Sequence, residues 1–114
     1  MTDRGASGAD GVRVVLVTAP DPEVAAELGR ALVGERLAAC VNVVPGLRSI
    51  YRWEGTVQDE AEVLLVMKTT EGCMNALCER VVALHPYEVP EVLALPVREG
   101  SEPYLRWIAG EVGS

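Results

Sequence analysis

The pattern of hydrophobic and polar positions predicts β-strands in the first half of the chain. Residues 12–17 form a continuous, largely β-branched run, which is typical of a buried strand. A second apolar strand is predicted over residues 38–44, and an alternating pattern continues it over residues 47–53. Pro45 and Gly46 interrupt this pattern. Because proline cannot donate to a strand ladder, we expect a bulge or bend there, near an edge of the sheet.

Two more strands are predicted in the second half of the chain. Residues 54–55, Glu-Gly, lie between two strand-like runs and suit a tight hairpin turn. The returning strand is expected over residues 56–69. A fourth strand is expected over residues 89–97, where Pro90 and Pro96 mark it as an edge or irregular strand.

Three helices are predicted between and after these strands. Asp21 gives an N-cap, and the Pro-Glu pair after it gives a proline and an acid in the first turn, so a helix is expected from residue 22 to about residue 35. Thr70 is expected to cap a second helix. His85 should end it, because the residue before a proline is pushed out of the helical region. Ser101 is expected to cap a last helix.

This order of elements predicts an α+β fold. A βαββαβ order with an extra C-terminal helix is the ferredoxin-like arrangement, an antiparallel sheet with helices on one face. However, residues 14–17 and 64–67 are apolar at every position, so their side chains cannot all face one layer of helices. The second face of the sheet needs a cover, and another copy of the chain is the simplest one. We therefore expect an obligate oligomer.

The chain length limits the number of domains, and the net charge argues against some classes of partner. The 114 residues leave room for one domain. We expect it over residues 12–114, after a disordered N-terminal tail over residues 1–11 that is rich in Gly, Ser and Asp. Seventeen acidic residues against ten Lys and Arg give a formal charge of −7, which argues against nucleic acid and against an anionic membrane surface as partners.

Cysteine usage and motifs bear on the compartment and on catalysis. The three cysteines are an odd number without a Cys-x-x-Cys pair, which favours a reducing compartment and a cytoplasmic location. The sequence contains no phosphate-binding loop, nucleophile elbow or dinucleotide motif, and no nucleophile–base pair can be identified. We therefore expect a protein that is not an enzyme.

His85 and Cys40 are the candidate metal ligands. His85 is the only histidine, and it either binds a metal or acts as a cation at a helix end, where it satisfies the last carbonyls. Cys40 lies in an apolar strand, where a cysteine is most often a small buried hydrophobe. One chain does not supply the close set of ligands that a zinc site needs, but an oligomer axis can bring several copies of one ligand together.

Several short motifs occur together in an order that is typical of one family. They are Ala-Cys-Val-Asn at residues 39–42, Pro-Gly at 45–46, Ser-x-Tyr-x-Trp-x-Gly at 49–55, His-Pro-Tyr at 85–87 and Tyr-Leu-x-Trp-Ile at 104–108. In this combination the chain resembles the CutA family of divalent-cation tolerance proteins. The resemblance implies a ferredoxin-like subunit in a tightly packed homotrimer, a link to copper and divalent-cation tolerance, and no established catalytic activity.

The resemblance also points to specific ligand positions. Some bacterial members of the CutA family are described as copper binders through a cysteine near the end of the first strand and a histidine pair before Pro-Tyr. The matching positions here are Val17, Leu84 and His85. Only His85 keeps a metal-binding side chain, so this chain departs from that pattern at the other two positions.

Two functions are open for such a trimer. In the first, the trimer binds or responds to copper or another divalent cation, with His85 and, less favoured, Cys40 as ligands. In the second, a signalling-type trimer binds a small polar or anionic metabolite, or a partner protein, at a cleft between subunits. The aromatic residues fall where subunit boundaries and a cleft are expected. The cleft is predicted to be lined by Tyr51, Trp53, Lys68, His85, Tyr87 and Glu91.

Overall fold

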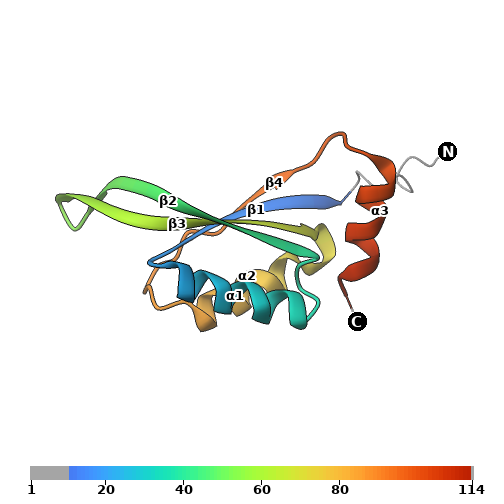
Figure 1. Ribbon diagram of the computed structural model, residues 1–114, viewed down its shortest axis with the longest axis horizontal. Helices are drawn as coiled ribbons and strands as arrows, with labels where there is room; N and C mark the ends of the chain where they lie inside the picture. The colour runs from blue at the N-terminus through green and yellow to red at the C-terminus, as the bar shows by residue number, and fades with distance from the viewer. Residues whose placement is uncertain (1–10, 114) are drawn as a thin grey trace.

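The computed structural model of the chain describes residues 11–113, which form four strands, three α-helices and a short 3₁₀ turn (Figure 1). In chain order the elements are β1 (Val12–Ala19), α1 (Pro22–Gly34), β2 (Cys40–Trp53), β3 (Thr56–Thr70), η2 (Glu71–Cys73), α2 (Met74–Leu84), β4 (Leu93–Pro96) and α3 (Glu102–Glu111).

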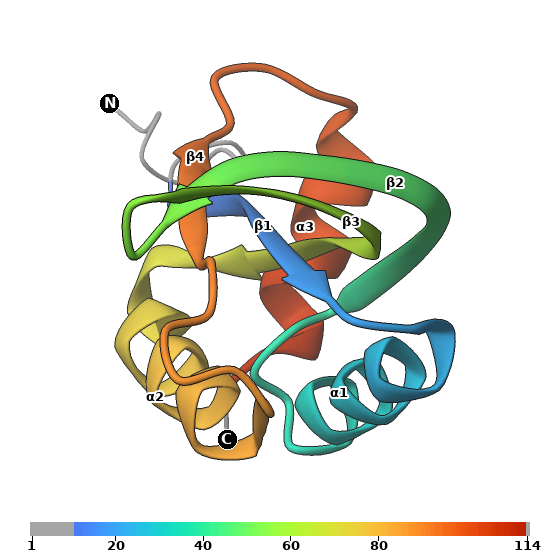
Figure 2. The same cartoon turned by 90° about the vertical axis from the view of Figure 1, so that its left-hand side faces the viewer.

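The strands form one antiparallel sheet in the order β2-β3-β1-β4. β1 is central: its Val15 lies opposite Met67 of β3 on one side and Ala94 of β4 on the other. α1 and α2 lie side by side against one face of this sheet (Figures 1 and 2). The α+β, ferredoxin-like fold that the sequence predicts is therefore confirmed.

The main core lies between the sheet and these two helices. Alternate side chains of β1 and β3 point toward the helices, so Val15 and Leu65 are fully buried. α1 begins as predicted: the Asp21 carboxylate accepts a hydrogen bond from the Val24 amide at 2.9 Å, and Pro22 opens the first turn. The fully buried aliphatic side chains of this core also include Val17, Leu32, Met67, Leu77 and Val81.

β2 and β3 extend beyond the helices as a long hairpin, which forms the left end of the molecule in Figure 1. Glu54 and Gly55 have φ values of 50° and 81°, the left-handed conformation that a two-residue hairpin turn of type I′ requires. The register between β2 and β3 shifts between Val44 and Leu47, and Gly46 there has a φ of 85°. The expected bulge is therefore present, and it lies on a strand at the edge of the sheet.

Two elements differ from the sequence prediction. The fourth strand covers only Leu93–Pro96, because Pro90 cannot donate to a ladder and the segment around it forms a loop. α2 does not start directly after Thr70. A 3₁₀ turn that contains the weak helix former Gly72 comes first, and the Thr70 side chain makes no capping hydrogen bond. Ser101 also precedes its helix without a side-chain cap.

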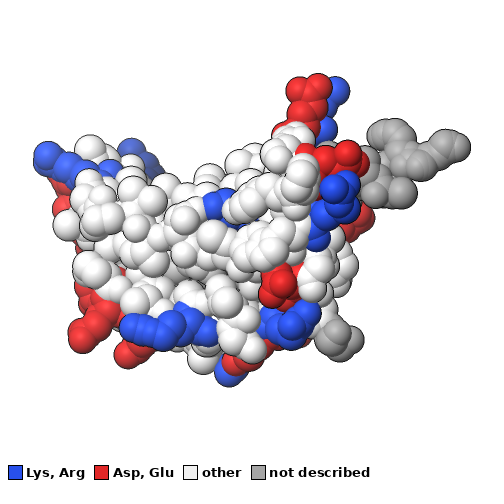
Figure 3. Space-filling view, turned by 45° about the vertical axis from the view of Figure 1, so that its right-hand side comes forward, with Lys and Arg blue, Asp and Glu red and all other residues white. Residues whose placement is uncertain are grey.

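The sheet face away from α1 and α2 is apolar and uncovered in the single chain. Leu93 and Leu95 of β4 are 57% and 50% exposed, and Val44 of β2 is 44% exposed. In the view of Figure 3 most charged side chains gather at the two ends and along the helical side, with a broad and largely uncharged area between them. The pairing of the strands places further, half-buried side chains on the same face, namely Val14, Leu16, Leu64 and Val66.

α3 packs at the end of the sheet that is far from the hairpin (Figure 1). Arg36, in the turn after α1, donates from its guanidinium to the carbonyls of Gly110 at 3.1 Å and Gly113 at 3.0 Å. These bonds satisfy carbonyl groups at the end of α3 that have no partner within the helix. A second, smaller core joins α3 to the sheet and consists of Val12, Ala39, Leu105 and Ile108.

The disordered tail expected over residues 1–11 lies outside the described residues except for Gly11. The Gly11 carbonyl accepts a hydrogen bond from the Glu71 amide at 2.5 Å. Within residues 11–113, no helix is both long enough and apolar enough to cross a membrane.

Candidate functional site

A groove lies between the β2–β3 hairpin and the loop that connects α2 to β4. Its volume is about 820 Å³, within the range of about 300–1,000 Å³ that is typical of small-molecule sites. The hairpin strands supply most of the lining, and Thr18, near the end of β1, also lines the groove. The loop supplies Tyr87 and the residues after it, so the groove joins segments that are far apart in the sequence.

Two tyrosine–glutamate pairs organise the groove. The Tyr87 phenol donates a hydrogen bond to Glu62 Oε2, and the Tyr51 phenol donates to Glu60 Oε1 at 2.7 Å. Donation to the Glu60 carboxylate raises the pKa of Tyr51. Burial, together with the bond to Glu62, raises the pKa of Tyr87 well above its ordinary value. Both phenols therefore stay protonated donors at neutral pH.

His85 lies next to the groove and is held on both sides of its ring. Its Nδ1 accepts a hydrogen bond from the Tyr87 amide at 3.1 Å, so Nε2 carries the proton and donates to the Thr18 carbonyl at 2.7 Å. The imidazole also packs against the Tyr87 ring, with 4.6 Å between the ring centroids. His85 is 7% exposed. In this arrangement the imidazole joins the end of β1 to the loop after α2 and positions that loop.

The groove collects most of the residues that the sequence predicts for the cleft. Tyr51, Trp53, Tyr87 and Glu91 line it directly, and His85 supports Tyr87 from behind. The signals for these residues were their alternation along the hairpin strand and their position at the chain reversal after α2.

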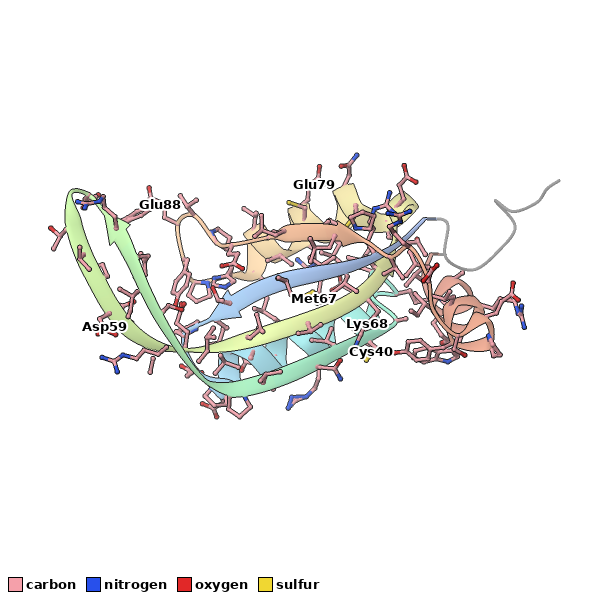
Figure 4. All side chains as sticks on the ribbon, turned by 90° about the horizontal axis from the view of Figure 1, so that it is seen from above. Cys40, Asp59, Met67, Lys68, Glu79 and Glu88 are labelled. Atoms are coloured by element: carbon pink, nitrogen blue, oxygen red, sulfur yellow. The ribbon has the colours of Figure 1, made fainter. Side chains whose placement is uncertain are left out.

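Lys68 does not line this groove. Its ammonium group donates to Asn42 Oδ1 and lies 3.9 Å from Cys40 Sγ. Figure 4 shows Lys68 and Cys40 together near one end of the sheet, whereas Asp59 and Glu88 lie at the hairpin end. Lys68 and Glu62 share one face of β3, but at about 3.3 Å per residue the six-residue separation places them roughly 20 Å apart. Within one chain, Lys68 therefore lies outside the groove, and its place in the cleft predicted between subunits stays a prediction.

The metal-ligand candidates are also dispersed. His85 lies beside the groove, and Cys40 lies at the Lys68 end of the sheet. Among residues 11–113, no three His, Cys, Asp or Glu side chains come together in a way that would hold a metal ion. Of the two positions where the resemblance implies further copper ligands, Val17 is fully buried in the core and Leu84 is exposed at the end of α2. The role of His85 and Cys40 as ligands stays a prediction.

The structure adds residues that the sequence analysis did not place in the cleft. Glu60 and Glu62 both line the groove, and Glu62 is 7% exposed. Thr18 also lines it and is 8% exposed. The alternation of Glu60 and Glu62 along β3 places both on one face, but their approach to Thr18 depends on strand register, which no local pattern reveals.

The fold and this site define an α+β protein of the ferredoxin-like class, with an uncovered apolar sheet face and a groove lined by aromatic and carboxylate side chains. Comparison with known proteins then identifies the family. The family model described as "CutA1 divalent ion tolerance protein" matches residues 13–111, so the chain belongs to the CutA1 family. The family assignment that the sequence motifs suggested is confirmed.

Individual relatives support the assignment. A divalent-cation tolerance protein CutA from Thermus thermophilus is 57% identical over 100 residues, which cover 88% of this chain and 97% of that protein. A structure of Cut A1 from the same organism is similar at a TM-score of 0.88 and 56% identity, over 90% of this chain and 99% of that one. The structure of CutA1 from Oryza sativa has a TM-score of 0.89 at 47% identity, over 94% of this chain and 98% of that one.

The relatives differ in length. Protein CutA from Mus musculus is 50% identical over 97 residues, which cover 85% of this chain but 55% of the mouse protein. The chain thus spans about half the length of the mouse protein, and nearly all of the T. thermophilus protein.

One expectation about location is wrong. A cytoplasmic location was expected from the cysteine usage. However, a structure from Archaeoglobus fulgidus with 31% identity and a TM-score of 0.86, over 90% of this chain and 99% of that one, is described as the periplasmic divalent cation tolerance protein CutA. The cysteine usage of this chain therefore does not establish a cytoplasmic location.

Proposed function

We propose that the chain forms a homotrimer that serves in divalent-cation tolerance without catalysing a reaction. The observation that carries this proposal is the uncovered apolar sheet face, on which Leu93 and Leu95 are each at least half exposed. Large apolar faces of this kind are interaction surfaces in soluble proteins. The same face in a second copy has matching chemistry, and the resemblance to the CutA family implies three copies.

The experiment that tests the oligomer is a mass measurement. Size-exclusion chromatography with light scattering, over a dilution series, should give roughly three times the subunit mass of 12.2 kDa. Dimers at every concentration would contradict the trimer. Stable monomers would contradict the whole proposal, because the apolar face would then be open to water.

Within this proposal, His85 is the main candidate ligand for copper. A metal ion at Nδ1 would have to replace the hydrogen bond from the Tyr87 amide, and a metal ion at Nε2 would have to replace the bond to the Thr18 carbonyl. Isothermal titration calorimetry of the full chain with Cu²⁺ should show binding. The variant His85→Ala should abolish this binding, and Cys40→Ala should reduce the affinity by a smaller amount. Equal affinity in the wild type and His85→Ala would exclude His85 as a ligand.

A second candidate function is the binding of a small metabolite at the cleft, as in a signalling trimer. The groove supports it, since a volume of about 820 Å³ and an aromatic wall suit a small molecule. A thermal-shift screen with metabolites of different charge tests it, because a ligand that binds only the folded state raises the unfolding temperature. A screen without any stabilising compound at high ligand excess would contradict this function.

A further inference from the structure

The face of β3 that points away from α1 and α2 carries opposite charges at its two ends. Glu60 and Glu62 lie at the hairpin end, and Lys68, the only lysine of the chain, lies at the other. Leu64 and Val66 lie between them. Alternate residues of a strand point to the same side, and the other set of β3 side chains forms the core under the helices. Along this face the side chains are therefore acidic, then apolar, then basic.

The two carboxylates at the hairpin end have no cation in their own chain. Within residues 11–113 neither Glu60 nor Glu62 forms an ion pair, and each accepts a hydrogen bond from a tyrosine. Arg48 is close by, but its guanidinium is paired with Asp59 through hydrogen bonds of 2.8 and 2.7 Å. The two glutamates are spaced about 7 Å apart along the strand, so one cation can lie close to both.

Lys68 has no acidic partner in its own chain either. Its ammonium group donates to Asn42 Oδ1, and it forms no ion pair with any of the described residues. The distance of roughly 20 Å along β3 keeps it from the carboxylate of Glu62 in the same sheet. An opposite charge for either end of this face therefore has to come from a neighbouring molecule.

The symmetry of a trimer makes the two ends of the face complementary. In a ring of three copies each interface is heterologous, so a patch on one copy meets a different patch on the next. The apolar side chains of this face, with Leu93 and Leu95 at least half exposed, make it the surface of association in the proposed homotrimer. Contact between the basic end of one copy and the acidic end of the next pairs the charges, whereas contact between like ends is costly.

We infer that the ammonium group of Lys68 of the partner subunit lies between Glu60 and Glu62, so that a trimer contains three such ion clusters. An ammonium has three N–H donors. Asn42 of its own chain accepts one, and the others are available to the two carboxylates. Lys68 then belongs to the cleft between subunits, beside Tyr51 of the neighbouring copy. The inference rests on the proposed homotrimer and names the contact that decides how its copies meet.

The cluster acts on the choice of contact more than on its strength. Removing charged groups from water offsets much of the attraction between them, whereas bringing like charges together costs several-fold in affinity or more. The presence of two carboxylates also means that neutralising one of them leaves the ammonium paired with the other. Reversal of the charge on Lys68 is therefore the most sensitive change.

A carbodiimide, which joins an amine directly to a carboxylate in contact with it, tests the cluster. The full chain should give linked chains on a denaturing gel, and mass spectrometry of the digest should show Lys68 joined to Glu60 or Glu62. Lys68→Arg keeps the charge and removes the amine, so the link should disappear while the mass in solution is retained. The double variant Glu60→Gln/Glu62→Gln should also lose the link, and Glu79→Gln, on the exposed side of α2 (Figure 4), should keep it.

Charge reversal tests the same contact without a reagent. Lys68→Glu places a third carboxylate against the other two and should weaken association by at least about tenfold, measured as a loss of mass on dilution by light scattering. Adding Glu60→Lys to Lys68→Glu restores opposite charges and should recover the wild-type mass. Arg30→Glu makes the same reversal at an exposed position of α1, away from this face, and should leave the mass unchanged.

The outcomes separate this inference from the homotrimer on which it rests. A trimer mass without a link from Lys68 to Glu60 or Glu62 overturns the ion cluster and leaves the trimer. The same holds if Lys68→Glu dissociates no more readily on dilution than Arg30→Glu. A monomer mass for the wild type overturns both. A link between Lys68 and these glutamates in particles of dimer mass supports the contact and overturns the trimer.

Discussion

Tyr87, in the loop after α2, donates its phenolic hydrogen to the carboxylate of Glu62 on β3, so one side-chain hydrogen bond joins positions 25 residues apart. The bond spans the groove between the loop and the hairpin, and its removal has consequences for stability.

Tyr87→Phe should destabilise the protein by about 1–3 kcal/mol, because the buried Glu62 carboxylate loses its phenolic donor. Urea unfolding at neutral pH measures the loss. Glu62→Gln keeps an acceptor for the phenol and removes the buried charge, so its stability should equal or exceed that of the wild type. A loss in Glu62→Gln as large as that in Tyr87→Phe would show that the bond is not the source of the effect.

Stability should fall at alkaline pH. Donation to Glu60 raises the pKa of Tyr51, and burial raises the pKa of Tyr87 and of Tyr104. A raised pKa means that the folded state holds the phenolic proton more tightly than the unfolded state does. The resulting stability is fully present below the unfolded pKa of about 10 and is lost as the pH rises through the folded values.

Urea unfolding at about pH 8 and about pH 11 checks this dependence, with absorbance near 295 nm to follow tyrosine ionisation. Tyr87→Phe should show a smaller loss between the two pH values than the wild type. A loss that Tyr87→Phe leaves unchanged would assign the alkaline effect to other groups.

Leu95→Glu should disrupt the proposed trimer, because it places a charge on the uncovered sheet face, where burial against another copy would be costly. Val82→Glu on α2 is a matched control, since Val82 and Leu95 are both 50% exposed in the single chain. Light scattering should give a molar mass below that of the wild type for Leu95→Glu and an unchanged molar mass for Val82→Glu. The opposite pattern would place the interface on the helical side.

Thr69→Val should cost about 1–2 kcal/mol, although valine has nearly the same shape. Thr69 is fully buried, and its hydroxyl donates to the Leu37 carbonyl at 2.7 Å, which joins the end of β3 to the turn after α1. Thr56→Val serves as the control, because it makes the same chemical change at the exposed start of β3. Equal unfolding free energies for the two variants would refute a structural role for this bond.

The fold could be predicted because its signals are local or periodic. Asp21 and the proline after it define the start of α1 within a few residues, and Gly46 marks the bulge where it occurs. The two elements whose bounds differ from the prediction differ for equally local reasons. β4 is shorter than predicted because Pro90 interrupts its first half, and α2 starts later than predicted because the 3₁₀ turn before it contains Gly72, a weak α-helix former.

The site could be predicted only in part, because it depends on register. Tyr51 and Tyr87 were assigned to one cleft from their chemistry, and the groove contains both. Lys68 was assigned to a cleft between subunits, and its distance from Glu62 along β3 keeps it out of the groove of its own chain, so its place in that cleft stays a prediction. The contact of Glu62 with Tyr87 joins two loosely patterned segments, and it becomes visible only when β3 and the loop after α2 are placed in space.

The positions of the two tryptophans have an optical consequence. Trp53 ends β2 in the hairpin and lines the groove, whereas Trp107 lies on α3 and stacks on Tyr104, with 5.5 Å between the ring centroids. The molecule is 52 Å long, and these two elements form its opposite ends (Figure 1). Their fluorescence therefore reports on separate regions. Replacing Trp107 by Phe leaves a single emitter whose spectrum follows the groove alone.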